Sequence, residues 1–111
     1  MEIKIRAVGK CKVLDCSGKL ILGPATATLR RTIHEAALDG TSKIVLNLAD
    51  VSQIDSSGIG EMISGYVHVT NLGGSMPLLN LNEKFHQLLI IAKLLAIFEV
   101  FDDEQKAFEG C

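Results

Sequence analysis

The run Ile44-Val45-Leu46-Asn47-Leu48 is the feature of this chain that most restricts its fold. Apart from Asn47 it is apolar on both alternating faces, and two of its residues are β-branched. Such a run is typical of a strand with other elements packed over both faces, as at the centre of a parallel sheet. It therefore predicts an α/β fold with this strand at the heart of the sheet.

Two strands are expected ahead of this run. Residues 2–8 alternate between apolar and charged side chains, which indicates a half-buried strand. Gly9-Lys10 can turn the chain, and so short a connection favours an antiparallel hairpin with a second strand over residues 11–17, ended by Gly18. The side chains expected to face the core are Ile3, Ile5, Leu14 and Cys16.

Helices are expected before and after the central run. Apolar residues recur at helical spacing from the loop at Gly23-Pro24 to Asp39-Gly40. A second helix is expected over about residues 57–72, closed by Gly73-Gly74 as a left-handed cap. The apolar faces are expected to comprise Ala25, Leu29, Ile33 and Ala36 or Ala37 in the first helix, and Ile59, Met62, Ile63, Tyr66, Val67 and Thr70 in the second.

The last third of the chain continues the alternation. Residues 76–81 are expected to form a strand, Asn82 to cap a third helix, and residues 98–101 to form a last short strand. Acidic residues 102–104 would begin a final helix, whose dipole they complement. This order predicts one α/β domain over residues 1–111, with a mixed sheet of about four to five strands, four helices and right-handed crossovers.

Composition narrows the functional classes. The chain has 111 residues, of which 48% are hydrophobic and 22% charged, enough for one globular core. With a formal net charge of -2 and no basic run longer than Arg30-Arg31, nucleic acid is not an expected partner. Charges interrupt the first six residues, which excludes the apolar core of a signal peptide. The longest apolar stretch, residues 88–100, contains Lys93 and Glu99, is too short to span a membrane and is expected in the core. With neither a signal peptide nor a membrane span expected, we expect a cytoplasmic protein with no membrane partner.

The cysteines and histidines carry no expected chemistry. Cys11, Cys16 and Cys111 form an odd set without zinc-ligand spacing, and a reducing compartment would keep them as thiols. The histidines are His34, His68 and His86. They are scattered, none at the spacing of a metal pair, and are expected at the surface or on helix faces. The sequence therefore predicts neither a metal site nor a cofactor.

The segment from Asp50 to Glu61 is expected to carry the function. It follows the central strand, and function in open α/β sheets tends to lie at the carboxyl ends of strands. Ser56 and Ser57 fall at the start of the next helix, where backbone N–H groups lack partners and the dipole is positive, so a phosphate would be tolerated. Capping by Asp55 or a serine is the simpler interpretation. It needs only one such residue, however, and does not account for two glycines that cost about 1 kcal/mol each in helix propensity.

Enzymatic interpretations fail on spacing. Ile63 stands where a dinucleotide-binding fingerprint beginning at Gly58 and Gly60 needs its third glycine, and Gly60 and Gly65 lack the Lys and Ser/Thr of a phosphate-binding loop. Ser56 is not flanked as in Gly-x-Ser-x-Gly, and no histidine can be tied to it. The chain is therefore not expected to be an enzyme.

A family resemblance rests on residues 44–60. Their sequence, IVLNLADVSQIDSSGIG, resembles the signature of STAS domains, especially those of bacterial anti-sigma factor antagonists. The likeness extends over nearly the whole chain, through Gly18 and Leu20, Gly73-Gly74, and the segment from Leu79 to Leu81. The central signature is specific, whereas the flanks are ordinary α/β material.

The resemblance implies a switch by phosphorylation. In that family the serine directly after the aspartate is phosphorylated by an anti-sigma factor, itself a serine kinase with a histidine-kinase-like ATPase fold, which gives Ser56 this role. The dephosphorylated protein would sequester the anti-sigma factor and free the sigma factor. Phosphorylation would end binding, because about -1.5 to -2 charges arrive beside Asp55. The residues expected to bind the partner are Asp55, Ser57, Gly58, Ile59, Lys19 and Ile21.

The sequence departs from the family pattern in one segment, and it also allows two other functions. Many antagonists read Gly-Glu-Leu-Asp where this chain reads Gly18-Lys19-Leu20-Ile21, so two acids near the expected docking face are lost. The same fold also suits a scaffold subunit of a stress-signalling assembly, or an accessory subunit of a lipid or anion transporter. A monomer or homodimer in solution would favour the antagonist, and a large homo-assembly would favour the scaffold.

Overall fold

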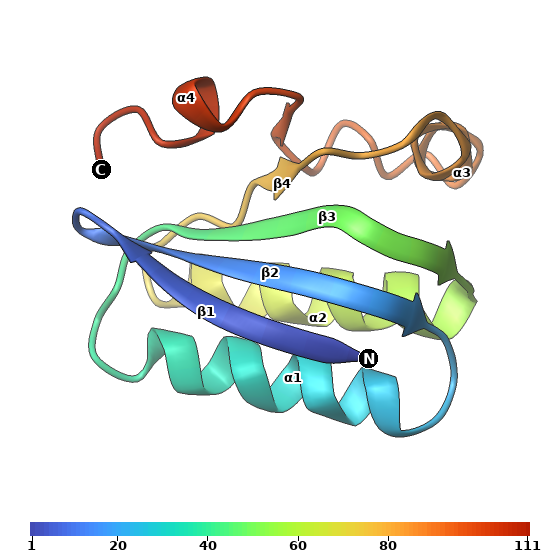
Figure 1. Ribbon diagram of the computed structural model, residues 1–111, viewed down its shortest axis with the longest axis horizontal. Coiled ribbons are helices and arrows are strands. Elements are labelled where there is room, and N and C mark those ends of the chain that lie inside the picture. Colours follow the sequence, from blue (N-terminus) through green and yellow to red (C-terminus); the bar gives the residue numbers. More distant parts are fainter.

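The computed structural model describes residues 1–111 and contains a five-stranded sheet with four helices (Figure 1). The strands are β1 Glu2–Val8, β2 Cys11–Leu20, β3 Ile44–Ile54, β4 Leu78–Leu79 and β5 Val100–Phe101. The helices are α1 Pro24–Ala37, α2 Ser56–Asn71, α3 Glu83–Ile91 and α4 Glu104–Ala107. Their order is the one expected from the sequence. None of these helices has the length and apolar character needed to cross a membrane.

The sheet is mixed, and its spatial order follows the chain from β1 to β5. β1 pairs antiparallel with β2, and every later pairing is parallel. β3 lies at the centre, as its two apolar faces predict. Because β2, β3 and β4 are parallel, their carboxyl ends lie at one edge of the sheet, which is where α1, α2 and α3 follow.

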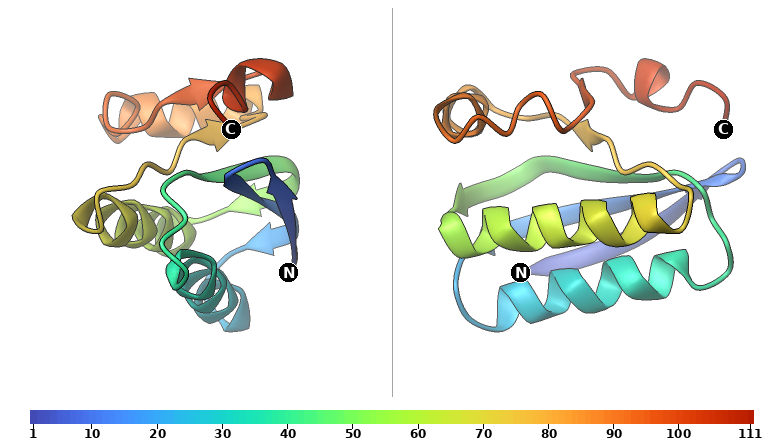
Figure 2. Two further views of the ribbon diagram at one scale, coloured as in Figure 1. Left: turned by 90° about the vertical axis from the view of Figure 1, so that its left-hand side faces the viewer. Right: turned by 180° about the vertical axis from the view of Figure 1, so that it is seen from behind.

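The main core lies between the sheet and the pair α1 and α2, which cover the same face (Figure 2). Leu14 and Leu46 reach it from the sheet, and Leu29 and Ile33 from α1. Ile5, which was expected to face the core, is 47% exposed because β1 is an edge strand that the helices cover only in part. On the opposite face a smaller buried cluster joins Val13, Val45 and Leu79 to Ala107 of α4.

Several predicted boundaries were wrong. Gly18 does not end β2, because the strand continues to Leu20 across register irregularities, with Gly18 at a φ of 107°. β4 and β5 have two residues each, and Asn80, with a φ of 60°, takes the chain out of β4. α2 buries Gly65 and Val69 and leaves Val67 46% exposed, because the helix approaches Ile33 of α1 through Gly65.

The apolar stretch over residues 88–100 is only partly core. Leu89 and Phe98 are buried, but Ile90 and Ile91 are exposed. α3 ends at Ile91, and Lys93, with a φ of 59°, turns the chain along the surface. Hydrophobicity alone therefore overstated the burial of this segment.

The cysteines depart from expectation, whereas His34 and His68 lie on helix faces as expected. Cys11 and Cys111 form a disulfide with a Cα–Cα distance of 5.4 Å, whereas Cys16 is a buried free thiol. The prediction of three thiols was wrong because the β1–β2 turn brings Cys11 next to a residue 100 positions away. His34 of α1 and His68 of α2 stack with their ring centroids 3.7 Å apart, a pairing that only the helix–helix packing creates.

Candidate functional site

The carboxyl ends of β2 and β3 lie side by side and lead into α1 and α2 (Figure 1). Lys19 pairs with Gln53, and Leu20 with Ile54. The loop that follows β2 is therefore held beside the start of α2. We call residues 19–23 and 55–60 together the α2 N-terminal surface.

Asp55 builds this surface. One carboxylate oxygen accepts a hydrogen bond from the backbone N–H of Gly58 at 2.9 Å, which caps α2, and the other accepts from the N–H of Leu22 at 2.9 Å. The backbone N–H of Asp55 also donates to the carbonyl of Leu20. The N–H groups of Leu22 and Gly58 lower the pKa of the Asp55 carboxyl, since both favour the charged form. Asp55 thus ties the loop after β2 to the start of α2.

Ser56 is the first residue of α2 and is exposed, with the half-buried Ser57 beside it. Because Asp55 makes the cap, the fold does not depend on either serine for capping. The helix dipole at this end favours negative charge. Ser56 therefore presents an accessible hydroxyl at a place where the fold tolerates an added anion.

The two glycines near the start of α2, Gly58 and Gly60, differ in the space that surrounds them. A Cβ on Gly58 would overlap the carbonyl oxygen of Leu20 and lie 2.8 Å from the Leu20 Cγ, so the close approach of α2 to β2 requires glycine. Gly58 is buried, so it has a packing role at this position, and its expected contact with a partner stays a prediction. Gly60 is exposed, and a Cβ there would meet nothing within 4 Å. It lies four residues after Ser56, on the same side of the helix.

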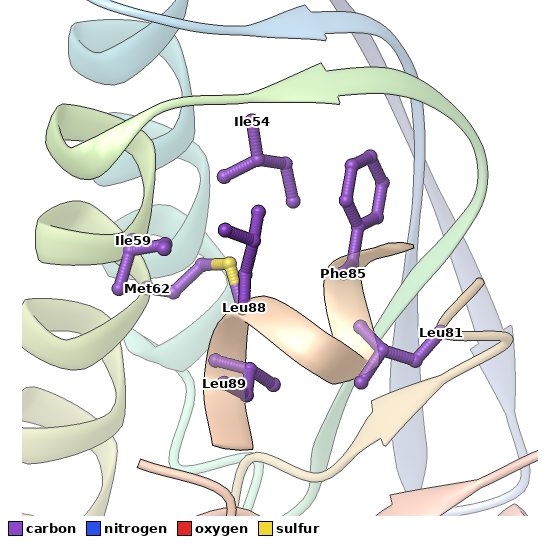
Figure 3. A pocket seen from close by; sticks show the side chains of 7 residues that line it. All are labelled: Ile54, Ile59, Met62, Leu81, Phe85, Leu88 and Leu89. Atoms are coloured by element: carbon purple, nitrogen blue, oxygen red, sulfur yellow. The ribbon is translucent and has the colours of Figure 1, made fainter. Parts of the chain in front are cut away.

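Ile59 is half-buried and lines a narrow hollow between α2 and α3 (Figure 3). The lining side chains are Ile54, Ile59, Met62, Leu81, Phe85, Leu88 and Leu89. All seven are apolar, so they provide no group for acid–base or nucleophilic chemistry. The contacts instead hold α3 against α2 beside the α2 N-terminal surface.

Leu22 is the residue that the sequence analysis missed. Its side chain is 76% exposed, while its backbone N–H is held by Asp55. Lys19 is exposed and Ile21 is half-buried in the same segment. The available signal was an apolar residue directly before Gly23-Pro24, in a loop where a core residue is not expected. The structure thus brings Ser56, Leu22 and Gly60 to one end of the molecule, on a surface that also carries Lys19 and the Asp55 carboxylate.

The fold and this surface define a class: small α/β domains with α1 and α2 on one face of a mixed sheet and a serine at the exposed start of α2. The chain belongs to the STAS domain family, whose model matches residues 2–107. The family assignment agrees with the fold expected from residues 44–60.

Comparison with individual proteins gives the same fold. The chain is 34% identical over 64 residues to an anti-sigma F factor antagonist from Paenibacillus polymyxa; the match covers 58% of this chain but only 55% of that relative. It is similar to the crystal structure of a candidate anti-sigma factor antagonist from Thermotoga maritima, with a TM-score of 0.87, 25% identity, and coverage of 96% of this chain and 92% of that one. It also shares the fold of SpoIIAA from Bacillus in the phosphorylated form, with a TM-score of 0.75, 22% identity and 97% of both chains covered.

Proposed function

We propose that this chain is an anti-sigma factor antagonist whose α2 N-terminal surface binds a cognate anti-sigma factor until Ser56 is phosphorylated. The observation that carries the proposal is an exposed serine at the start of α2 that the fold does not need as a cap, since Asp55 makes the cap. The relative from Paenibacillus polymyxa, named as an anti-sigma F factor antagonist, supports the same function.

Charge explains how phosphorylation would end binding. Unmodified Ser56 is small and neutral, so a partner can cover it without stripping water from an ion. A phosphate adds about -1.5 to -2 charges one residue from the Asp55 carboxylate. Changing a complex from mostly bound to mostly free takes about 5.5 kcal/mol of differential affinity, which desolvation of such a group can supply. SpoIIAA in the phosphorylated and unphosphorylated forms shares the fold of this chain, with TM-scores of 0.75 and 0.72, which supports a switch without refolding.

The apolar and flat parts of the surface supply the contact. Leu22, at 76% exposure, can anchor a partner by burying its side chain, while Gly60 lets the partner approach the backbone of α2 next to Ser56. Lys19 and Ile21 stand where many antagonists carry acidic residues. The partner of this chain is therefore expected to bind without contacts to those two acids.

In this proposal the chain is ligand and substrate rather than catalyst. The anti-sigma factor, a serine kinase with a histidine-kinase-like ATPase fold, transfers the terminal phosphoryl group of ATP to the Ser56 oxygen. The hydroxyl proton is lost, and ADP leaves. This reaction would take place in the cytoplasm, where ATP and the sigma factor are found.

Two exposed serines of α2 give a matched test. Ser56→Asp places a charge on the α2 N-terminal surface, whereas Ser64→Asp places the same charge on an exposed position of the same helix two turns further on. We expect Ser56→Asp to weaken binding to the anti-sigma factor at least about tenfold, and Ser64→Asp to leave it unchanged, in a calorimetric titration. Equal effects of the two variants would refute the proposed surface.

A further inference from the structure

The Cys11–Cys111 disulfide fastens the C-terminal segment, residues 102–111, to the opposite end of β2 from the α2 N-terminal surface (Figure 1). The two Cα atoms are 5.4 Å apart. The backbone N–H of Lys10 donates to the carbonyl of Cys111 at 2.9 Å, and the Lys43 ammonium donates to the carbonyl of Glu109 at 3.2 Å. Figure 2 shows the C-terminus near the β1–β2 turn in both views.

The segment covers apolar side chains of the sheet. Ala107 is buried against Val13, Val45 and Leu79, on the face opposite α1 and α2. The short helix in this segment has four residues, too few to be stable without tertiary contacts. Its other attachments include an exposed ion pair between Arg6 and Glu104 at 2.9 Å, a type of contact that contributes little. The disulfide is therefore the strongest tie between the segment and the sheet.

We propose that Cys11 and Cys111 form a redox modification site, in which reduction by a dithiol releases the C-terminal segment from the sheet and oxidation by a disulfide fastens it again. The site would take a thioredoxin-type dithiol as its reductant and a glutathione-type disulfide as its oxidant. This inference takes the cytoplasmic location from the proposed function, but it does not depend on the role of Ser56.

The burial of the two sulfur-bearing residues indicates the order of the reaction. Cys11 is buried, at 5% exposure, while Cys111 is half-buried, so the incoming thiolate attacks the Cys111 sulfur. A mixed disulfide with Cys111 forms, and Cys11 leaves as a thiolate that takes up a proton. The second thiolate of the reductant then attacks the reductant's first sulfur, which is bonded to Cys111 in the mixed disulfide. Cys111 leaves as a thiolate and is also protonated. Two electrons pass to the protein, and the reductant becomes a disulfide.

Cys16 is kept out of this exchange. It is 2% exposed and points into the core formed with α1 and α2, on the other face of β2 from the small cluster. Burial raises the pKa of its thiol to about 12, so little thiolate is present near neutral pH. Cys16 therefore serves as an internal reference for the two reactive cysteines.

The cytoplasmic location proposed above favours a redox role of the Cys11–Cys111 disulfide on general grounds. In a reducing cytoplasm, disulfides that do form are typically transient or redox-sensing. β2 spans ten residues, or roughly 30 Å at about 3.3 Å per residue, between Cys11 and the α2 N-terminal surface. Redox control of the C-terminal segment can therefore operate without disturbing the surface around Ser56.

Hydrogen exchange of the full chain in two redox states tests the proposal. The protein is oxidised with glutathione disulfide or reduced with thioredoxin under native conditions, and the cysteines are then counted by alkylation in denaturant. We expect one reactive thiol, Cys16, in the oxidised form and three in the reduced form. Reduction should speed amide exchange in residues 104–111 at least about tenfold and leave β3 unchanged.

Two variants make the result decisive. Cys111→Ser lies at the half-buried end of the pair and should show fast exchange in residues 104–111 whatever the redox state. Cys16→Ala should keep the full redox response. The proposal is overturned if thioredoxin fails to reduce the native disulfide, if exchange of residues 104–111 is the same in both states, or if Cys16 is found in the disulfide.

Discussion

Alanine substitutions at Gly58 and Gly60 should have different effects on stability, although the two residues are only two positions apart in α2. Both changes gain helix propensity, worth up to about 1 kcal/mol relative to glycine. At Gly60 the new Cβ meets nothing within 4 Å, so we expect Gly60→Ala to stabilise the fold by about 0.5–1 kcal/mol.

Gly58→Ala adds a cost that Gly60→Ala lacks. The Cβ would overlap the carbonyl oxygen of Leu20 and lie 3.2 Å from the Cγ2 of Ile54. Overpacking of this kind costs about 1–3 kcal/mol, and a backbone oxygen cannot move aside as the end of a flexible side chain can. Because the propensity gain is common to both variants, their difference in the free energy of unfolding should be about 1–3 kcal/mol.

Thermal unfolding followed by circular dichroism measures this difference. Unfolding entropy of about 2.1 cal/mol/K per residue converts 1 kcal/mol into roughly 4 °C for a chain of 111 residues. Gly60→Ala should therefore melt above the parent protein, and Gly58→Ala should melt about 4–12 °C below Gly60→Ala. If Gly58→Ala and Gly60→Ala melt at the same temperature, α2 does not approach β2 as described, and the packing role of Gly58 is refuted.

Three further outcomes follow from the same contacts. Ser56→Ala should change the free energy of unfolding by less than about 0.5 kcal/mol, since Asp55 makes the cap; a larger loss in urea unfolding would mean that the Ser56 hydroxyl supports the fold. The pKa of Asp55 is lowered below its ordinary value of 3.8, so its stabilising effect is complete above that value and is lost as the pH falls further. Asp55→Asn should therefore lower stability near neutral pH and flatten the loss of stability below about pH 4 in acid unfolding; an unchanged acid profile would contradict this role. Phe85→Ala, at a site 2% exposed, should cost about 3–5 kcal/mol, and a loss below about 1 kcal/mol would show that α3 is not packed as described.

The fold was predictable where local patterns and tertiary packing agree. Residues 44–48 indicate a buried strand, and this strand lies at the centre of the sheet. The alternation in residues 2–8 and the short turn after it were enough to predict the hairpin of β1 and β2. Asn82 was recognised as a cap, and its side chain accepts from the N–H of Phe85 at 2.8 Å.

Other features depend on contacts that no local pattern encodes. The sequence predicted that α2 begins near Ser56, but not that Gly58 and Gly60 differ in the space around them, which depends on the position of the Leu20 carbonyl. The disulfide joins residues 100 positions apart, and a count of cysteines gives no register for such a pair. The exposed side chain of Leu22 is a consequence of how Asp55 holds the loop, so hydrophobicity alone did not identify it.

Phosphorylation and binding of the chain by the proposed anti-sigma kinase, measured on one sample, test the central claim most directly. We expect ATP to label Ser56 and no other residue, the unmodified protein and Ser56→Ala to bind the kinase equally well, and the phosphorylated protein to lose affinity toward the roughly 10⁴-fold that full release needs. Label that persists in Ser56→Ala, or a phosphorylated protein that binds as tightly as the unmodified one, would contradict the account.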